Sequence, residues 1–164
     1  MAHARQLNSG LLEQLYQRPG FMIRRAYQLT VAIFADELAA TLITPTQYGI
    51  LCVLAGDRPI DQAGVARLLG LDRSNAGYVV STLEKRGLLL RTPGLPDRRR
   101  MMLALTDRGR VTLDEATALA EHVPVRTLAM FTDAEREQFL VLLGKLVAGL
   151  SSDSTLPFES QPSD

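Results

Sequence analysis

Four arginines lie within RTPGLPDRRR, residues 91–100, and three of them are consecutive. Apolar runs of strand length stand on both sides, LLLRT at 88–92 and MMLAL at 101–105. The Pro and Gly residues between these runs favour a loop, so the pattern predicts a β-hairpin with a basic tip. Guanidinium groups bind phosphate oxygens through paired hydrogen bonds, so a cluster of them indicates a polyanionic partner. The clustered residues are Arg98, Arg99 and Arg100.

A second set of polar side chains precedes the hairpin, on a helix expected over residues 73–86. Its apolar positions 76, 79, 80 and 83 share one face, which leaves the polar residues on the opposite, exposed face. Gly77 lies inside this helix at a cost of about 1 kcal/mol relative to Ala. It is explained either by close approach to a ligand or by tight packing against the preceding helix. The predicted contact residues of this helix are Arg73, Ser74, Asn75, Gly77, Tyr78 and Thr82.

The helix over residues 73–86 is the second of a closely spaced pair. Asp61 caps a short helix that stops at Gly70, and Asp72 caps the next helix two residues later. Two short helices joined by a tight turn predict a helix-turn-helix, and the following hairpin makes it a winged helix. Such a unit inserts its second helix into the major groove of DNA, where side chains reach base edges. We expect Arg99 at the hairpin tip to enter the adjacent minor groove.

The charge distribution supports this interpretation. The chain has 164 residues and a formal net charge of zero. Residues 57–110 nevertheless contain eleven Lys and Arg against six Asp and Glu, a net charge of +5, and the remainder carries −5. A basic middle segment between acidic ends is typical of a nucleic-acid-binding surface that the overall charge conceals.

The remaining segments read as helices. We expect one over residues 20–41, one from the capping box Thr44-Pro45-Thr46-Gln47 to a left-handed cap at Gly56, and a long one from Thr106 that Pro124 breaks. A second capping box at 132–135 opens a final helix of about 18 residues. The predicted fold class is mostly α with a small β-hairpin wing, a winged helix-turn-helix lobe plus a helical dimerisation region. The expected divisions are 1–43 (N-terminal dimerisation helices), 44–106 (DNA-binding lobe), 107–150 (C-terminal dimerisation helices) and 151–164 (disordered tail).

Other classes of function find little support in the residues. The single cysteine and two distant histidines argue against a disulfide or a metal site within one chain. There is no nucleophile–base pair, phosphate-binding Gly loop or pair of catalytic carboxylates at useful spacing. No apolar run reaches membrane-spanning length, and the N-terminus lacks a signal-peptide pattern. We therefore expect a cytoplasmic, non-enzymatic protein without cofactor, metal or membrane partner. A winged helix used only for protein contacts remains an alternative.

Residues 20–150 resemble the MarR family of bacterial transcription regulators, on the motifs TPTQY, LGLDRS, LEKRGL, the DRR wing and the LT-x-x-G after it. The resemblance implies a homodimer with interlocked terminal helices and two winged-helix lobes on a palindromic double-stranded DNA operator. It also implies a ligand cleft between the dimerisation and DNA-binding helices. Arg99 occupies the family's D-x-R position. Many members have Thr-Val-Thr-Arg where this chain has Asn-Ala-Gly-Tyr, so the operator sequence does not transfer.

Dimerisation is also supported by the residues themselves, because the last helix carries more apolar side chains than a two-lobed monomer buries, among them Leu140, Leu143 and Leu146. The leading interpretation is a ligand-responsive regulator, expected to be a repressor. Its effector is expected to be a small aromatic carboxylate or phenolic compound, as in members governing catabolism of aromatic acids, including nicotinate-type compounds. Arginines would bind the carboxylate and aromatic rings would form the walls. The predicted ligand-binding residues are Arg18, Phe21, Arg24, Arg25, Gln28 and Tyr48.

Each of these ligand assignments has a structural alternative. Arg24 or Arg25 would otherwise pair with Asp36, Glu37 or the partner chain, and Tyr48 would otherwise belong to the core. A different alternative is an oxidation sensor that acts through Cys52. The apolar neighbours of Cys52 in the sequence predict instead a buried, unreactive thiol.

Overall fold

The computed structural model describes residues 9–56, 58–94 and 100–153, and helices form most of this part of the chain. A three-stranded antiparallel sheet of order β1-β3-β2 accompanies them, so the predicted fold class is confirmed for the described residues. In chain order the elements are α1 (Ser9–Tyr16), α2 (Pro19–Glu37), α3 (Pro45–Ala55), β1 (Ile60–Asp61), α4 (Gln62–Leu68), α5 (Arg73–Lys85), β2 (Leu89–Pro93), β3 (Met101–Leu105), α6 (Asp107–Ala120), α7 (His122–Thr127) and α8 (Asp133–Asp153).

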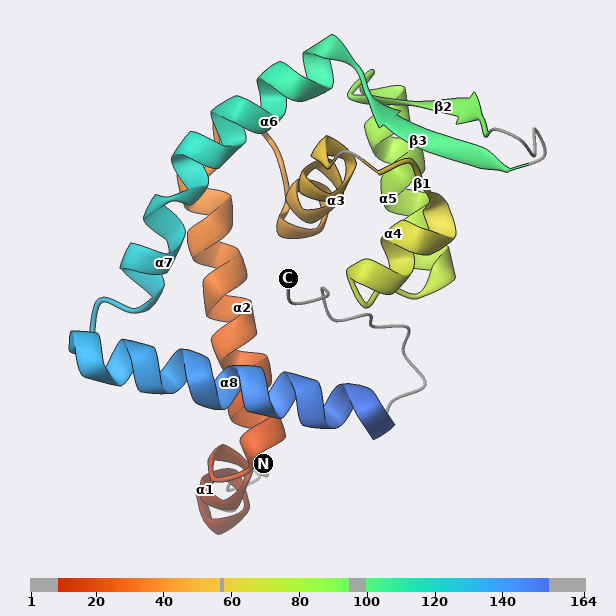
Figure 1. The fold of residues 1–164 in the computed structure, drawn as a ribbon. Helices are drawn as coiled ribbons and strands as arrows, with labels where there is room; N and C mark the ends of the chain where they lie inside the picture. The colour runs from red at the N-terminus through yellow and green to blue at the C-terminus, as the bar shows by residue number, and fades with distance from the viewer. Residues whose placement is uncertain (1–8, 57, 95–99, 154–164) are drawn as a thin grey trace, which may run out of the picture.

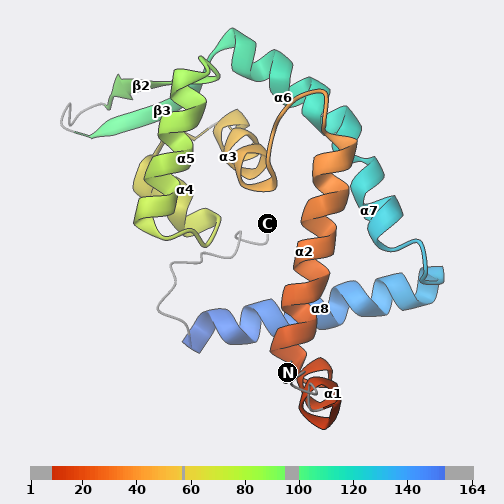
Figure 2. The same ribbon diagram turned by 180° about the vertical axis from the view of Figure 1, so that it is seen from behind.

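The elements gather in two parts. Figures 1 and 2 show α3, α4, α5 and the sheet together on one side of the molecule, and α1, α2, α7 and α8 away from the sheet. Helix α6 begins next to β3 and leads to α7, so it connects the two parts (Figure 1). No helix in the described ranges is long and apolar enough to cross a membrane.

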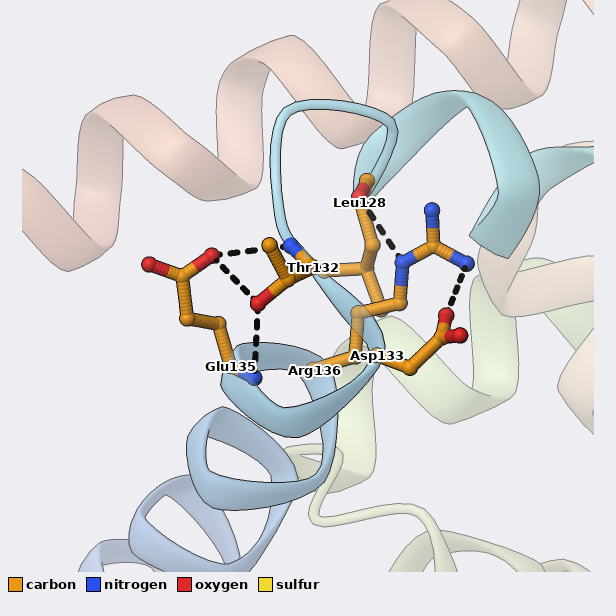
Figure 3. A network of polar contacts seen from close by, with 5 residues as sticks. All are labelled: Leu128, Thr132, Asp133, Glu135 and Arg136. Carbon is orange, nitrogen blue, oxygen red and sulfur yellow. Dashed lines mark hydrogen bonds and ion pairs between the residues drawn. The ribbon is translucent and has the colours of Figure 1, made fainter.

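The capping residues begin the helices as predicted. Thr44 Oγ1 accepts from the Gln47 backbone N–H at 3.3 Å, and Gln47 Oε1 accepts from the Thr44 N–H at 3.2 Å. Thr132 and Glu135 form the second capping box before α8, which Figure 3 shows from close by. The Thr132 N–H and then its hydroxyl lower the pKa of Glu135 by donating to the carboxylate. Both boxes are made within four residues, which is why the sequence alone indicates them.

Helix ends agree less well with expectation. Pro124 breaks the long helix as predicted, since α6 ends at Ala120, the residue whose carbonyl the proline ring would meet. Gly56 does not form the expected left-handed cap: its φ is −69° and its backbone is extended, because the chain leads directly toward β1. Helix α8 continues to Asp153, past residue 151 where the disordered tail was expected to begin. Residues 154–164 lie outside the described residues.

One apolar core joins α3, α4, α5 and the sheet to the end of α2. Leu38 and Ile43, on either side of the α2–α3 turn, are 1% and 3% exposed and pack with α3, α5 and the sheet. Helices α6 and α7 complete the core with three residues. The buried members are Phe34, Leu38, Ile43, Ile50, Leu51, Leu54, Val65, Val79, Val80, Leu83, Leu88, Leu89, Leu103, Leu105, Leu113, Ala116 and Val123.

The start of α6 is locked to the turn after α5. Thr106 Oγ1 accepts from the Gly109 N–H at 2.9 Å and donates to the Gly87 carbonyl at 2.7 Å. Gly109 lies so close to the Leu88 carbonyl that a Cβ at this position would fall 1.9 Å from its oxygen. The LT-x-x-G motif is therefore explained by packing: threonine caps the helix and glycine lets the backbones approach.

We predict that Gly109→Ala destabilises the protein by roughly 2–4 kcal/mol, because backbone rather than a flexible side chain must move to admit the methyl group. Urea denaturation measures this. The matched control is Gly49→Ala in α3, where a Cβ meets only Leu69 methyl groups at 3.4–3.5 Å. This variant should match or exceed wild-type stability, by up to about 1 kcal/mol, through its better helix propensity. Equal stability of the two variants would contradict the packing account.

Candidate nucleic-acid interface

Helices α4 and α5 form the predicted helix-turn-helix. Asp61 accepts from the Gly64 N–H and Asp72 from the Asn75 N–H, both at 2.8 Å, so both expected caps are present. The turn between the helices contains Gly70 with a φ of +61°, a left-handed conformation that favours glycine. The tight turn lets the inner faces of the two helices pack together in the core.

The outer face of α5 presents the predicted contact residues to solvent. Arg73, Ser74 and Asn75 are exposed in its first turn, and Tyr78 is 74% exposed one turn later. The opposite face is buried, with Ala76, Val80 and Leu83 at 0% exposure. Thr82 is only half-buried, and its hydroxyl donates to the Tyr78 carbonyl at 2.9 Å. Polar and aromatic groups therefore stand together on one side of a helix whose other side is fixed by packing.

Gly77 has a packing role. A Cβ at this position would lie 3.1 Å from Gln62 Nε2, so glycine lets α5 approach the first residue of α4 closely. The Gln62 side chain is itself held, because its Oε1 accepts from Arg91 at 3.2 Å. Arg91 also donates from Nε to Glu84 at 3.1 Å. This network joins α4, α5 and β2, and so it connects the helix-turn-helix with the base of the wing.

The base of the wing is attached to the start of α4. Strand β3 pairs with β2 over five residue pairs and with the two-residue strand β1, which the sequence pattern did not predict. At the edge of this sheet, the Arg100 guanidinium lies 2.5 Å from Asp61 Oδ2. Arg100 thus makes an intramolecular contact at the base of the wing. Arg98 and Arg99 lie outside the described residues.

Asp61 performs two tasks with its two carboxylate oxygens: Oδ1 caps α4 and Oδ2 binds Arg100. The Arg100 hydrogen bond, followed by the Gly64 N–H, lowers the pKa of Asp61 below its usual value. The carboxylate is therefore held in its charged form by both partners. Asp61 was expected only as a cap, and nothing in the local sequence indicates a partner 39 residues away.

A hollow of about 400 Å³ lies beside the first turn of α5. Two arginines line it, Arg67 from α4 and Arg73 from α5, with apolar side chains between them. The N-terminus of α5 is already capped by the Asp72 carboxylate, so the positive charge that this hollow offers to an anion comes from the two arginines. Its lining residues are Gln62, Ala63, Ala66, Arg67, Leu71 and Arg73.

The predicted ligand-binding residues do not come together in one chain. Tyr48 is half-buried; its hydroxyl bonds to Thr117 of α6 at 3.3 Å, and its ring centroid lies 5.7 Å from that of Phe34. Phe21, by contrast, packs edge-on against Tyr16 near the start of α2. Phe21 and Phe34 are 13 residues apart on one helix, a rise of about 20 Å. Arg18, Arg24, Arg25 and Gln28 are exposed along that length, and Arg25 bonds to Gln28 at 3.3 Å.

One local expectation about this region is wrong, and the contact weighed as an alternative for Arg24 and Arg25 is made by another arginine. Cys52 is exposed, not buried, because the face of α3 that enters the core is formed by Ile50, Leu51 and Leu54. Its thiol neighbours Tyr48, and burial is the main cause that raises the pKa of the Tyr48 phenol above its usual value. The partner of Asp36 and Glu37 is Arg126 of α7, at 2.5 and 2.6 Å, rather than Arg24 or Arg25. In the described part of the chain no group of three or more His, Cys, Asp or Glu residues is arranged to hold a metal ion.

Comparison with known proteins agrees with this geometry. Residues 43–100, from the end of the α2–α3 turn to the residue before β3, match the family model described as MarR family. A putative transcriptional regulatory protein for the hcr operon of Thauera aromatica is 34% identical over 132 residues, 77% of each chain. The chain belongs to the MarR family. It is a transcription regulator of the MarR type.

Two solved structures extend the similarity beyond residues 43–100. The transcriptional repressor CouR of Rhodococcus jostii, bound to a 23-mer DNA duplex, is 30% identical with a TM-score of 0.75, covering 82% of this chain and 95% of CouR. BpsR of Bordetella bronchiseptica, solved in a study of its regulation by 6-hydroxynicotinic acid, is 30% identical with a TM-score of 0.76, covering 80% of this chain and 94% of BpsR.

We predict that Asp61→Asn reduces the acid sensitivity of the protein. Because the folded-state pKa of Asp61 lies below its unfolded value, the carboxylate contributes stability at neutral pH, and this contribution is lost as pH falls through the folded-state pKa. Asparagine keeps a capping oxygen but not the charge. Urea midpoints measured from pH 7 to pH 3 should therefore fall less steeply for the variant. As a control, Asp114→Asn on α6 removes an exposed carboxylate and should leave the slope unchanged.

Proposed function

We propose that this MarR-type regulator is a repressor that binds a palindromic double-stranded DNA operator as a homodimer and responds to a small aromatic acid. The observation that carries the proposal is the outer face of α5, where Ser74, Asn75 and Tyr78 stand exposed beside a basic hollow and the base of the wing. A module used only for protein contacts or for catalysis does not require this combination. The DNA complex of the similar repressor CouR supports it.

In this proposal α5 lies in the major groove. Asn75 and Ser74 carry short amide and hydroxyl groups that pair with base edges, and Tyr78 contacts a thymine methyl group or a phosphate. Arg67 and Arg73 neutralise backbone phosphates beside the helix. Arg98 and Arg99 of the wing, with Arg99 first, reach into the neighbouring minor groove, where negative potential attracts arginine. Arg100 contributes charge near the DNA while its bond to Asp61 anchors the wing.

The homodimer is supported by the terminal helices. None of the described side chains of α8 is buried, although the run Phe139–Leu143 is apolar on every side of the helix. A helix that is hydrophobic all round is stable in water only when other protein covers it. Helix α1 likewise exposes Leu11, Leu12 and Leu15. A second copy of this chain covering both would place two α5 helices on half-sites about 10 bp apart.

The effector site is proposed at the corner formed by α2, α3 and α6, around Tyr48, Phe34 and Thr117. The aromatic rings and the hydroxyl pair suit an aromatic carboxylate or phenolic compound. The similarity to BpsR, which is described with 6-hydroxynicotinic acid, supports this class. A second candidate is oxidation sensing at Cys52, because its thiol is exposed beside Tyr48.

We predict that DNA binding falls steeply with salt. A dimer that neutralises about eight phosphates gives a slope of log K against log[salt] near −7. Fluorescence anisotropy with a duplex selected by the protein from a random library measures the slope. Leu146→Glu on α8 should separate the copies and roughly halve the slope. Arg99→Ala should lower affinity about tenfold at unchanged thermal stability. A flat salt response of the wild type would exclude the proposed function.

We predict that an aromatic carboxylate raises the melting temperature and releases the DNA. A ligand that binds only the folded protein stabilises it by about 2.7 kcal/mol at one hundred times its Kd. A thermal-shift screen with 6-hydroxynicotinate, salicylate and benzoate measures this. Tyr48→Ala should abolish the shift and Cys52→Ser should retain it. If no compound shifts the wild type, and peroxide releases DNA from the wild type but not from Cys52→Ser, oxidation sensing replaces this assignment.

A further inference from the structure

Arg86 joins the C-terminal end of α5 to the turn between α2 and α3. Its Nη1 donates to the Leu42 carbonyl at 2.9 Å and to Gln47 Oε1 at 3.2 Å, and its Nη2 donates to the Thr41 carbonyl at 3.1 Å. The guanidinium is half-buried, and its partners are 39 to 45 residues away in the sequence. One planar side chain therefore connects the helix proposed to read DNA with a turn outside the helix-turn-helix.

The α2–α3 turn is shaped for this contact. Leu42 has a φ of +55°, the left-handed region in which a non-glycine residue pays about 1–3 kcal/mol. It is the one non-glycine residue with positive φ among those the structure describes. Its side chain is 76% exposed, so burial does not repay this cost. This conformation turns the Leu42 carbonyl toward Arg86. The turn itself is anchored by the buried side chains of Leu38 and Ile43.

The same turn is held from the other part of the molecule. Arg126 of α7 binds Asp36 and Glu37, which form the last residues of α2 immediately before the turn. Side-chain contacts therefore hold this stretch of chain on both sides, from α7 at the end of α2 and from α5 at the turn that follows. Helices α2 and α7 lie on the side of the molecule away from the sheet, and α5 lies in the winged-helix part (Figure 1).

Arg86 is not needed to complete either helix end. The two bonds of the α3 capping box run between Thr44 and Gln47, and Arg86 adds a further hydrogen bond to the same Gln47 Oε1. The end of α5 has its own backbone bonds, from the Gly87 N–H to Glu84 at 2.8 Å and from the Leu88 N–H to Leu83 at 3.0 Å. The three side-chain bonds of Arg86 therefore serve the connection between the two parts rather than the folding of either one.

We propose that Arg86 is a positioning residue for operator recognition, which fixes α5 relative to α2 and passes displacements of α2 and α7 to the DNA-reading face. The inference rests on the proposed function. Arg86 contacts no base in this proposal and acts through the alignment of Ser74, Asn75 and Tyr78. Its loss therefore affects the reading of sequence more than the attraction to phosphate.

The test measures operator and non-specific DNA separately. Arg86→Gln removes the charge and the fork, and Lys85→Gln, one residue earlier on the same helix end, removes the same charge from an exposed side chain. Anisotropy titrations at one salt concentration compare a duplex selected by the wild type from a random library with a scrambled duplex. All titrations are run at least 15 °C below the melting temperature of the variant, so that every sample is folded. If Arg86→Gln melts too low, Arg86→Lys takes its place.

We expect Arg86→Gln to reduce the ratio of operator to non-specific affinity about tenfold, comparable to the loss of one base contact. Lys85→Gln should lower both affinities together and leave the ratio unchanged, because non-specific binding depends on charge. An unchanged ratio in Arg86→Gln would overturn the positioning role, and so would an equal fall in Lys85→Gln. If the wild type binds neither duplex, the proposed function itself fails, which the wild-type titration reveals before any variant is compared.

Discussion

The complete burial of one side of α5 decides what the other side presents. Ala76, Val80 and Leu83 are fully buried against the lobe core, and this leaves the helix a single rotational setting. Ser74, Asn75 and Tyr78 face solvent as a consequence, and the hollow beside Arg73 forms against α4. A DNA-reading surface made of short side chains needs this rigidity, because base edges are distinguished by hydrogen bonds that tolerate little displacement.

The charged residues around α5 stabilise the fold, whereas the polar residues on its exposed face are those proposed to contact DNA. The acidic residues of the basic segment, residues 57–110, have structural roles: Asp61 and Asp72 cap helices, and Glu84 binds Arg91. Two of the arginines that make the segment basic, Arg91 and Arg100, are paired with acids at the base of the wing. The net charge of this segment therefore includes arginines that already bind acidic residues of the same chain. It is not a count of the arginines that bind phosphate in the proposal.

The two parts of the molecule are connected by polar bonds as well as by the core. Arg126 holds the end of α2 and Arg86 holds the turn that follows it. Apolar packing around Leu38 and Ile43 keeps this turn in place, while the hydrogen bonds from Arg86 fix the orientation of its carbonyl groups. A regulator needs such a connection, since a ligand changes DNA binding only through contacts that differ between two arrangements of its parts.

The sequence by itself determined the starts of α3, α4, α5, α6 and α8, the break at Pro124, the helix-turn-helix and the family, because capping residues, proline and short motifs act within a few residues. It also indicated which face of α5 is polar, since helical periodicity is local. It did not indicate α1. Only the tertiary structure decided that Cys52 is exposed, that Gly56 is extended, and that Tyr48 packs against Phe34, which lies about 20 Å along α2 from Phe21. The partners of Asp61, Arg86 and Arg126 lie 39 to 90 residues away. No local pattern specifies such contacts, which arise from how the packed core brings distant backbone and side chains together.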